Sequence, residues 1–333
     1  MTGPVHRQIV QIHPTRHCNL RCRHCYSESG PDQWEEVPVS TLCGSLRDAR
    51  EEGFDTASFS GGEPLLYSPL RYLLREARAL GYSTNLVTNG MLLTERRIAE
   101  LVGYVDVLAI SLDGRPETHD RMRRSCDAFA QMKRRLPALR ESTIPFGFIF
   151  TLTQWNMDQL PWVARFAVEQ GAVLLQVHPL EAFGAGRDLQ PSVPDGRECL
   201  AAFLAVASLQ AELGSAITLQ IDLCDRGTVE DEPGRVYADE PPADPWNRDL
   251  SELASPLVIQ SDGWVVPFQY GMPEPLRIGN VNEESLATMA RRWKREGVGR
   301  LRDVCRRTAD AALDDVGRPF FNWYEAVRKT ALR

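Results

Sequence analysis

The sequence lacks several features of secreted, membrane-bound and nucleic-acid-binding proteins. Residues 1–7 contain no apolar signal core, and no window approaches the ~18 apolar residues of a membrane span. The net charge of −7 disfavours a nucleic acid or an anionic membrane as partner. There is no internal repeat and no low-complexity tract. A chain of 333 residues with 43% hydrophobic residues therefore fits one large soluble domain, or a domain with an appendage.

Cysteine is scarce and unevenly placed. The chain has eight cysteines, of which three lie in one short loop, so the pattern is not that of a disulfide framework. A reducing cytoplasm is the expected location. The other five are scattered along the chain: Cys43, Cys126, Cys199, Cys224 and Cys305.

The clustered cysteines, Cys18, Cys22 and Cys25, have the spacing C-x3-C-x2-C and follow the apolar run 9–12. Cysteine thiolates hold iron–sulfur clusters, usually four for a four-iron cluster. Three thiolates on one loop would leave one iron open to a substrate or cofactor. On spacing alone zinc is the alternative, because His17 or His24 would supply the fourth ligand that zinc prefers.

Strand-like and helix-like patterns alternate through the first half of the chain. The predicted strands are 7–12, 56–60, 83–88, 105–111, 146–152 and 173–178, and the predicted helices between them are 40–52, 69–80, 95–102, 128–140 and 160–170. Such alternation predicts a parallel sheet with right-handed crossovers. The expected fold class is α/β, a complete or partial (β/α) barrel with its site at the carboxyl ends of the strands.

Unusual residues follow the predicted strands at that edge. The segment Gly61-Gly62-Glu63-Pro64 follows the second strand, Asn89-Gly90 the third, and Ser111-Leu112-Asp113-Gly114 ends the fourth. Each has an ordinary structural interpretation as a turn, since glycine, asparagine and aspartate favour turns. Their convergence on one edge favours a shared site.

These motifs, in this order, resemble those of the radical S-adenosylmethionine (SAM) enzymes, with His24 at the position that is aromatic in the family's cysteine loop. The resemblance implies a partial (β/α)6 TIM-like barrel, one [4Fe–4S] cluster on Cys18, Cys22 and Cys25, and SAM chelated at the open iron. The SAM-binding residues implied by the resemblance, or proposed from their place at the strand ends, are His24, Gly61, Gly62, Glu63, Asn89, Ser111, Asp113, Thr151 and His178.

Further candidates follow the fifth and sixth strands. Thr153, Asn156 and Glu181 are placed to approach SAM or substrate, although a lone residue such as His178 is more often a structural group. Gly184-Ala185-Gly186-Arg187 resembles the glycine-rich turn that often follows the sixth strand in the family. Arg187 is the candidate for binding a substrate carboxylate. The basic piece 121–124 is interpreted as a solvated helix end.

We expect a radical SAM barrel over residues 1–205 and a smaller α+β extension over 206–333. The extension resembles the SPASM or twitch region of many radical SAM enzymes in residues 261–267 and 278–286, with a hairpin at 257–260 and 264–268. A strand is expected at 217–223, a long acidic loop at 225–249, and helices near 197–213 and 284–295. Phe268 stands where the family has a cluster-binding cysteine, so the auxiliary cluster is expected to be lost.

The resemblance implies reductive cleavage of SAM to a 5′-deoxyadenosyl radical that abstracts hydrogen from the substrate. Maturation of a ribosomally made peptide is favoured, because the extension most resembles those of peptide maturases. Alternatives are modification of a sugar, nucleoside or amino acid, and a non-catalytic metal-binding module. Expected partners are a low-potential electron donor, such as flavodoxin or ferredoxin, and a separate peptide-recognition protein, since no peptide-binding domain precedes residue 7.

One scattered cysteine is a candidate catalytic hydrogen donor. Cys126 follows the fourth strand, and an S–H bond is weak enough to return a hydrogen atom to a substrate radical. Cys224, which ends an apolar run, is the second candidate. The alternative for both is that of a buried structural thiol.

Overall fold

The computed structural model describes residues 7–238 and 245–333, which fold around one sheet of ten strands. The strands lie in the order β11-β10-β9-β1-β2-β3-β4-β5-β6-β7. They are β1 (Ile9–Ile12), β2 (Thr56–Phe59), β3 (Ser83–Thr88), β4 (Val107–Ser111), β5 (Phe146–Leu152), β6 (Leu174–Pro179), β7 (Thr218–Ile221), β9 (Leu257–Ile259), β10 (Trp264–Pro267) and β11 (Gly279–Asn280). Strands β1 to β7 pair in parallel with their neighbours.

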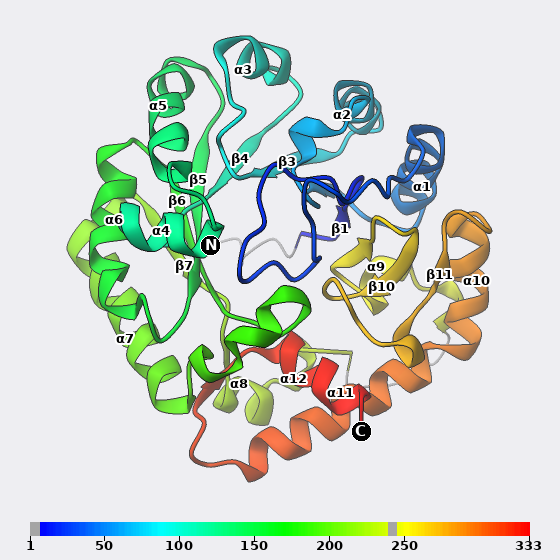
Figure 1. Ribbon diagram of the computed structural model, residues 1–333. Helices are drawn as coiled ribbons and strands as arrows, with labels where there is room; N and C mark the ends of the chain where they lie inside the picture. Colours follow the sequence, from blue (N-terminus) through cyan, green and yellow to red (C-terminus); the bar gives the residue numbers. More distant parts are fainter. Residues whose placement is uncertain (1–6, 239–244) are drawn as a thin grey trace.

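Helices cover the outer face of the curved sheet (Figure 1). They are α1 (Val39–Glu51), α2 (Leu70–Ala79), α3 (Glu95–Leu101), α4 (Pro116–Arg123), α5 (Ala128–Glu141), α6 (Leu160–Glu169) and α7 (Gly196–Leu213). Short 3₁₀ helices η1 (Pro64–Leu66), η2 (Met157–Gln159), η3 (Gly184–Ser192) and η4 (Gly214–Ala216) lie in the connections. The expected α/β fold, a partial barrel of parallel β/α units, is confirmed.

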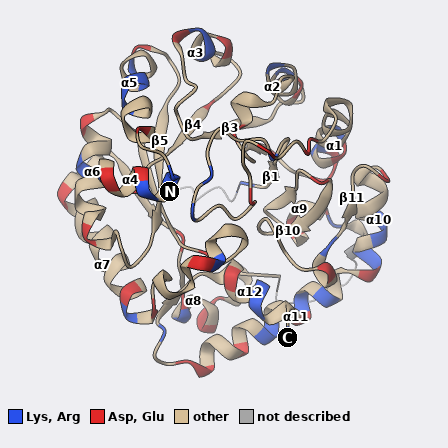
Figure 2. Ribbon diagram, in the orientation of Figure 1, with Lys and Arg blue, Asp and Glu red and all other residues tan. Residues whose placement is uncertain are grey.

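Alternation along the strands separates an apolar outer face from an inner face that lines a cavity. In β1, Val10 and Ile12 are fully buried, whereas Ile9 and Gln11 line the cavity. Successive side chains of a strand point to opposite faces, so the helices pack on one set and the other set faces the centre of the ring. Many charged residues lie on the outer helices (Figure 2).

Helix α4 was not predicted from the sequence. It has Pro116 in its first turn and ends at Arg124, which has a left-handed φ of 50°. Of its eight residues, PETHDRMR, only Met122 is a large apolar residue, so no helical hydrophobic period marks it. The other predicted helices and strands of the barrel lie within two residues of their expected bounds.

The C-terminal region joins the barrel sheet. Strand β9 pairs in parallel with β1, and β10 pairs antiparallel with β9. The predicted hairpin turn is confirmed: Gly263 has φ 88° and donates its N–H to the carbonyl of Gln260 at 2.9 Å. The division of the chain at residue 205 stays a prediction, and that position lies within α7.

The expected loop over 225–249 is wrong for its first part, which forms β8 (Cys224–Asp225) and α8 (Arg226–Asp231). The Asp225 carboxylate accepts hydrogen bonds from the N–H groups of Gly227 and Thr228, at 3.2 and 3.0 Å, and so caps α8. Residues 239–244 of that segment lie outside the described residues. The other elements are η5 (Pro233–Arg235), η6 (Pro245–Asn247), α9 (Leu250–Leu253), η7 (Glu274–Leu276), α10 (Leu286–Glu296), α11 (Val298–Asp314), β12 (Phe320–Phe321) and α12 (Trp323–Ala331).

Helices α11 and α12 occupy the part of the ring between α8 and α10 (Figure 1). Strand β12 pairs with β8, which brings the start of α12 beside the end of β7. The C-terminal region thereby walls one side of the central cavity.

One segment corrects the expectation that no window resembles a membrane span. Residues Gly196–Ala216, which comprise α7 and the turn after it, are long and apolar enough to cross a membrane by length and composition. In the structure α7 packs against β7, β12 and α6. A single helix of this kind is weak evidence for a membrane span, since core helices of soluble proteins pass the same test.

Candidate active site

A cavity of about 1030 Å³ lies inside the ring of strands. It is larger than most single-ligand pockets, which reach about 1,000 Å³. Its barrel wall is largely polar and comes from the inward residues of the parallel strands, among them Gln11, Ser58, Asn85, Ser111 and Gln176. The loop that carries Cys18, Cys22 and Cys25 closes the carboxyl end of this wall, and all three cysteines line the cavity.

Each of the three cysteine sulfurs accepts a hydrogen bond. Cys18 Sγ accepts from the N–H of Leu20 at 3.4 Å, and Cys25 Sγ accepts from the N–H of Ser29 at 3.3 Å. Burial raises the pKa of the Cys18 thiol and raises that of Cys22 to about 11, so these thiols must lose protons when they bind metal. The three sulfurs face one cavity and have N–H donors. This arrangement suits the thiolate ligands of an iron–sulfur cluster, because hydrogen bonds to the sulfurs tune the properties of such a cluster.

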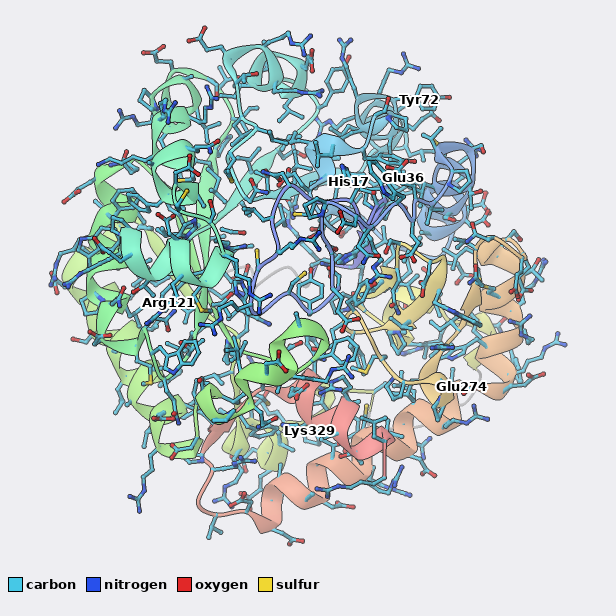
Figure 3. The ribbon with its side chains drawn as sticks, in the orientation of Figure 1. His17, Glu36, Tyr72, Arg121, Glu274 and Lys329 are labelled. Atoms are coloured by element: carbon cyan, nitrogen blue, oxygen red, sulfur yellow. The ribbon has the colours of Figure 1, made fainter. Side chains whose placement is uncertain are left out.

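The arrangement of its candidate ligands does not support the zinc alternative. His17 stacks on Trp34 with ring centroids 4.2 Å apart and does not line the cavity (Figure 3). His24 lines the cavity as a neutral ring, since burial lowers its pKa to about 4, and its Nε2 lies 3.8 Å from Asp113. Within the described residues, no three His, Cys, Asp or Glu side chains form a group that could hold a single metal ion. A four-iron cube binds each thiolate at a separate iron, so the three sulfurs need not surround a single metal ion.

The glycine pair after β2 packs on the cysteine loop. Gly62 donates its N–H to the carbonyl of Thr15 at 2.8 Å, and Glu63 donates its N–H to that of His17 at 2.9 Å. Gly61 has φ 119°, and a Cβ at Gly62 would meet the His17 carbonyl oxygen well inside van der Waals contact. Both glycines line the cavity, and the absence of a Cβ lets their backbone pack directly on the cysteine loop.

Glu63 differs from its expected role as a charge beside the cofactor. Its side chain is fully buried and does not line the cavity. The carboxylate accepts hydrogen bonds from the Asn89 N–H at 2.9 Å, the Thr88 hydroxyl at 2.8 Å and the Leu65 N–H at 3.2 Å. Burial raises the pKa of Glu63 to about 7, although these three hydrogen bonds act to lower it. Glu63 therefore fixes the end of β3, including Asn89, which does line the cavity.

The two candidate residues at the end of β4, Ser111 and Asp113, have different surroundings. Ser111 lines the cavity, but Asp113 is fully buried outside the lining. Asp113 Oδ2 accepts from Arg123 Nε at 2.6 Å, while Oδ1 has no hydrogen-bond partner among the described residues. The contact of Asp113 with the ribose stays a prediction. Burial would raise the pKa of Asp113, but Arg123, His24 and His119 together lower it below its ordinary value.

Arg123 corrects the interpretation of the basic piece as a solvated helix end. It is only 8% exposed, it lines the cavity, and its Nη1 lies 3.6 Å from Cys22 Sγ. The carbonyl of Met122 accepts from the N–H of Arg23 at 2.8 Å, which fastens α4 to the cysteine loop. Its neighbour Arg121 lies on the outer side of α4, over the ring of Trp155 (Figure 3). No sequence signal marked Arg123, because the helix α4 that carries it was itself not predicted.

Thr151 and His178 line the cavity as expected. Burial would lower the pKa of His178, but hydrogen bonds to Asp222 and Glu181 raise it to about 10, with Nδ1 3.0 Å from Asp222 and Nε2 3.3 Å from Glu181. Gln176 Nε2 also donates to Asp222 at 2.7 Å. Asp222 follows β7 and was missed, because it became a candidate only when β7 paired with β6. Thr153 and Asn156 are fully buried and bind each other.

Two remaining candidates lie outside the cavity. Arg187 is exposed and pairs with Glu28 at 2.9 Å, so it does not line the site. Cys126 is exposed and is not part of the lining either, which corrects its proposed role as hydrogen donor. Cys224, the second candidate, does line the cavity, and burial raises the pKa of its thiol to about 11.

The C-terminal region supplies an aromatic wall opposite the barrel strands. Phe268 and Tyr324 stack there with centroids 5.3 Å apart. The aromatic residues that line this side of the cavity are Phe203 of α7 and, from the C-terminal region, Phe268, Tyr270, Phe320, Trp323 and Tyr324. Cys199 and Cys305 are buried in α7 and α11 and are not part of the lining.

The family comparison agrees with this geometry. The model of the radical SAM superfamily matches residues 12–167, which contain the cysteine loop, the glycine pair and Arg123. Residues 12–167 form a domain of the radical SAM superfamily. Enzymes of this superfamily use a [4Fe–4S] cluster and SAM.

Two curated relatives match this chain over about half its length. Pre-heme d1 synthase of Dinoroseobacter shibae is 32% identical over 184 residues, which are 54% of this chain and 45% of the relative. Fe-coproporphyrin III synthase of Methanosarcina barkeri is 33% identical over 167 residues, 49% of this chain and 42% of the relative. The aligned part thus covers less than half the length of each of these relatives.

Solved structures share the fold over most of this chain. SuiB of Streptococcus suis bound to SAM has a TM-score of 0.67 with 17% identity, covering 90% of this chain and 68% of SuiB. The enzyme anSMEcpe with bound SAM has a TM-score of 0.64 with 17% identity, covering 97% of this chain and 96% of the other. At such identities these likenesses concern the fold alone.

Proposed function

We propose that this protein is a radical SAM enzyme that abstracts a hydrogen atom from a carbon of its substrate. The observation that supports this most is that one cavity contains three cysteines with N–H donors to their sulfurs, a glycine pair, and polar residues from the strand ends. When bound, the cluster supplies one electron that splits SAM into methionine and a 5′-deoxyadenosyl radical.

The chain's own residues would hold and orient SAM. The backbone of Gly61 and Gly62 is open to the ammonium group, and Ser111, Asn89 and Thr151 offer hydroxyl and amide groups to other polar atoms. Arg123 holds Asp113 and the Cys22 sulfur in one arrangement. The aromatic wall would exclude water from a reactive radical.

For the substrate we propose a peptide rather than a polycarboxylate tetrapyrrole. Coproporphyrin, named in one sequence relative, carries several carboxylates and would need unpaired cations. Within the described part of the chain, each cation of the lining already faces a carboxylate: Arg123 with Asp113, His178 with Asp222 and Glu181, and Arg235 with Glu232. One structural neighbour, SuiB, was solved bound to its precursor peptide SuiA.

Three further parts of the proposal follow from the sequence. The extension keeps its fold without an auxiliary cluster, since Phe268 replaces the expected ligand and stacks on Tyr324. A flavodoxin or ferredoxin supplies the electron. A separate protein presents the peptide. A sugar, nucleoside or amino acid substrate remains the second candidate, and no contact in the cavity favours it over a peptide.

The substrate test uses anaerobically reconstituted protein with SAM and reductant. We expect peptides translated from short reading frames beside its gene to raise 5′-deoxyadenosine above the substrate-free background and to change mass. Iron coproporphyrin III, offered in parallel, should do neither. Turnover of the tetrapyrrole, with inert peptides, would contradict the peptide assignment.

A further inference from the structure

The segment after β10 has an unusual backbone at the wall of the cavity. Phe268 has φ 70°, and the N–H of Gln269 donates to the carbonyl of Pro267 at 2.9 Å. A positive φ with a hydrogen bond between residues i and i+2 is the rare and strained form of the γ-turn. For a bulky side chain such a φ is an outlier that the surrounding structure must enforce.

Three contacts enforce this turn. The N–H of Phe268 donates to the carbonyl of Pro256 at 2.6 Å, and the Phe268 ring stacks on Tyr324. Gly271, with φ 76°, packs so closely on Phe183 that a Cβ there would overlap the ring. The turn is therefore held in place from both sides, and it fixes where Gln269 lies.

Gln269 lines the cavity with an unsatisfied side-chain amide. Its Nε2 and Oε1 are both buried, and neither has a hydrogen-bond partner among the described residues. Buried polar atoms are nearly always paired in native proteins, so a side chain with two unpaired atoms points to a missing partner. The indole N–H of Trp323, in the same wall, is also buried without a partner.

The position of Gln269 relates it to the reacting centre. Its neighbour Tyr270 packs on Tyr26, with centroids 5.5 Å apart, and Tyr26 follows the cluster ligand Cys25. A group bound by Gln269 would thus lie on the substrate wall beside the cysteine loop. The backbone strain at Phe268 and the unpaired amide occur at the same place, as expected for a binding device.

We propose that Gln269 recognises the main chain of one extended substrate residue through a pair of hydrogen bonds. A carboxamide offers a donor and an acceptor side by side. The N–H and C=O of a single extended residue, which belong to two successive trans peptide bonds, point to the same side and are one complement. The Trp323 N–H would donate to a neighbouring carbonyl. This rests on the proposed function for the identity of the site, and it names the chemical group that the C-terminal wall selects.

The test measures amide recognition without turnover. Reconstituted protein with SAM and no reductant is titrated calorimetrically with N-acetylphenylalanine N-methylamide and with its ester analogue, O-acetylphenyllactic acid N-methylamide, in which an oxygen replaces the N–H of the phenylalanine residue. We expect the wild type to bind the amide more tightly than the ester. In Gln269→Leu the amide should lose about tenfold in affinity, within the range for two neutral hydrogen bonds, and the preference over the ester should vanish. Gln190→Leu, at an exposed glutamine outside the cavity, should keep the wild-type preference.

Two results would overturn the proposal. One is an equal affinity of the wild type for amide and ester. The other is a loss of SAM affinity in Gln269→Leu with the amide preference intact, which would make SAM the partner of this side chain. Substrate-free SAM cleavage by the wild type is measured separately, so a failure of the proposed chemistry is distinguished from a failure of amide recognition.

Discussion

The ion pair between Arg123 and Asp113 gives the sharpest prediction about stability. Both side chains are buried, Asp113 completely, and Nε lies 2.6 Å from Oδ2. Replacing Arg123 by Met removes the cation and leaves a buried carboxylate. Breaking a buried pair in this way costs about 3–5 kcal/mol. We expect the free energy of unfolding of Arg123→Met apoprotein, measured in urea, to fall by that amount at pH 7.

The same ion pair predicts that the effects of the two substitutions on stability are coupled. Arg123→Met leaves the Asp113 carboxylate buried without a cation, and Asp113→Asn removes that charge. The double variant should therefore be more stable than the sum of the two single effects predicts. Because the pKa of Asp113 is lowered in the folded state, the stabilisation is present at neutral pH. It should be lost only as the pH falls below the ordinary value of 3.8.

The assay has a clear contrary outcome. A loss below about 1 kcal/mol in Arg123→Met would be the size expected for an exposed ion pair. Strict additivity of the two substitutions would likewise show that the charges do not interact. Either result would refute the assignment of Arg123 as the buried link between α4 and the cysteine loop.

Three other variants test separate parts of the site. Gly62→Ala should abolish SAM binding because its Cβ would meet a backbone carbonyl, whereas Gly44→Ala has open space and should bind normally; equal affinities would be contrary. His178 has a pKa raised to about 10, so its contribution to stability should be full below pH 6.5 and lost as the pH rises through about 10; a stability gap to His178→Asn that is constant in urea titrations from pH 6 to 10 would argue against a charged imidazole. Cys224→Ala should alter the product or its deuterium content in heavy water, and Cys126→Ala should not; the reverse would restore Cys126 as the hydrogen donor.

The barrel and the cofactor end of the site were predictable because their signals are local. Strands of four to seven residues separated by amphipathic helices give a periodic pattern, and the cysteine loop and the glycine pair are contiguous motifs. Side-chain direction was not predictable. Glu63 and Asp113 sit in motif positions, yet their carboxylates face N–H donors and Arg123 rather than the cavity.

The place of the C-terminal residues in the wall of the cavity could not be predicted from the sequence, for a different reason. Strand β9 was predicted as one strand of a hairpin, but its pairing with β1 across about 250 residues of chain was not, because a local pattern does not show which distant strands pair. Asp222 and Gln269 become part of the site only through that pairing and through β7. The left-handed φ of Phe268 is likewise invisible in sequence, because residues of its kind rarely adopt it.

The measurement that tests the central claim most directly combines iron content with SAM cleavage. Anaerobically reconstituted protein should hold about four iron per chain, the content of one cube, and should form 5′-deoxyadenosine from SAM when reduced. Joint replacement of Cys18, Cys22 and Cys25 by Ala should abolish both, while Cys305→Ala, a buried thiol outside the cavity, should retain both. Iron and SAM cleavage that survive in the triple variant would contradict the account, and a reproducible content near eight iron would refute the loss of the auxiliary cluster.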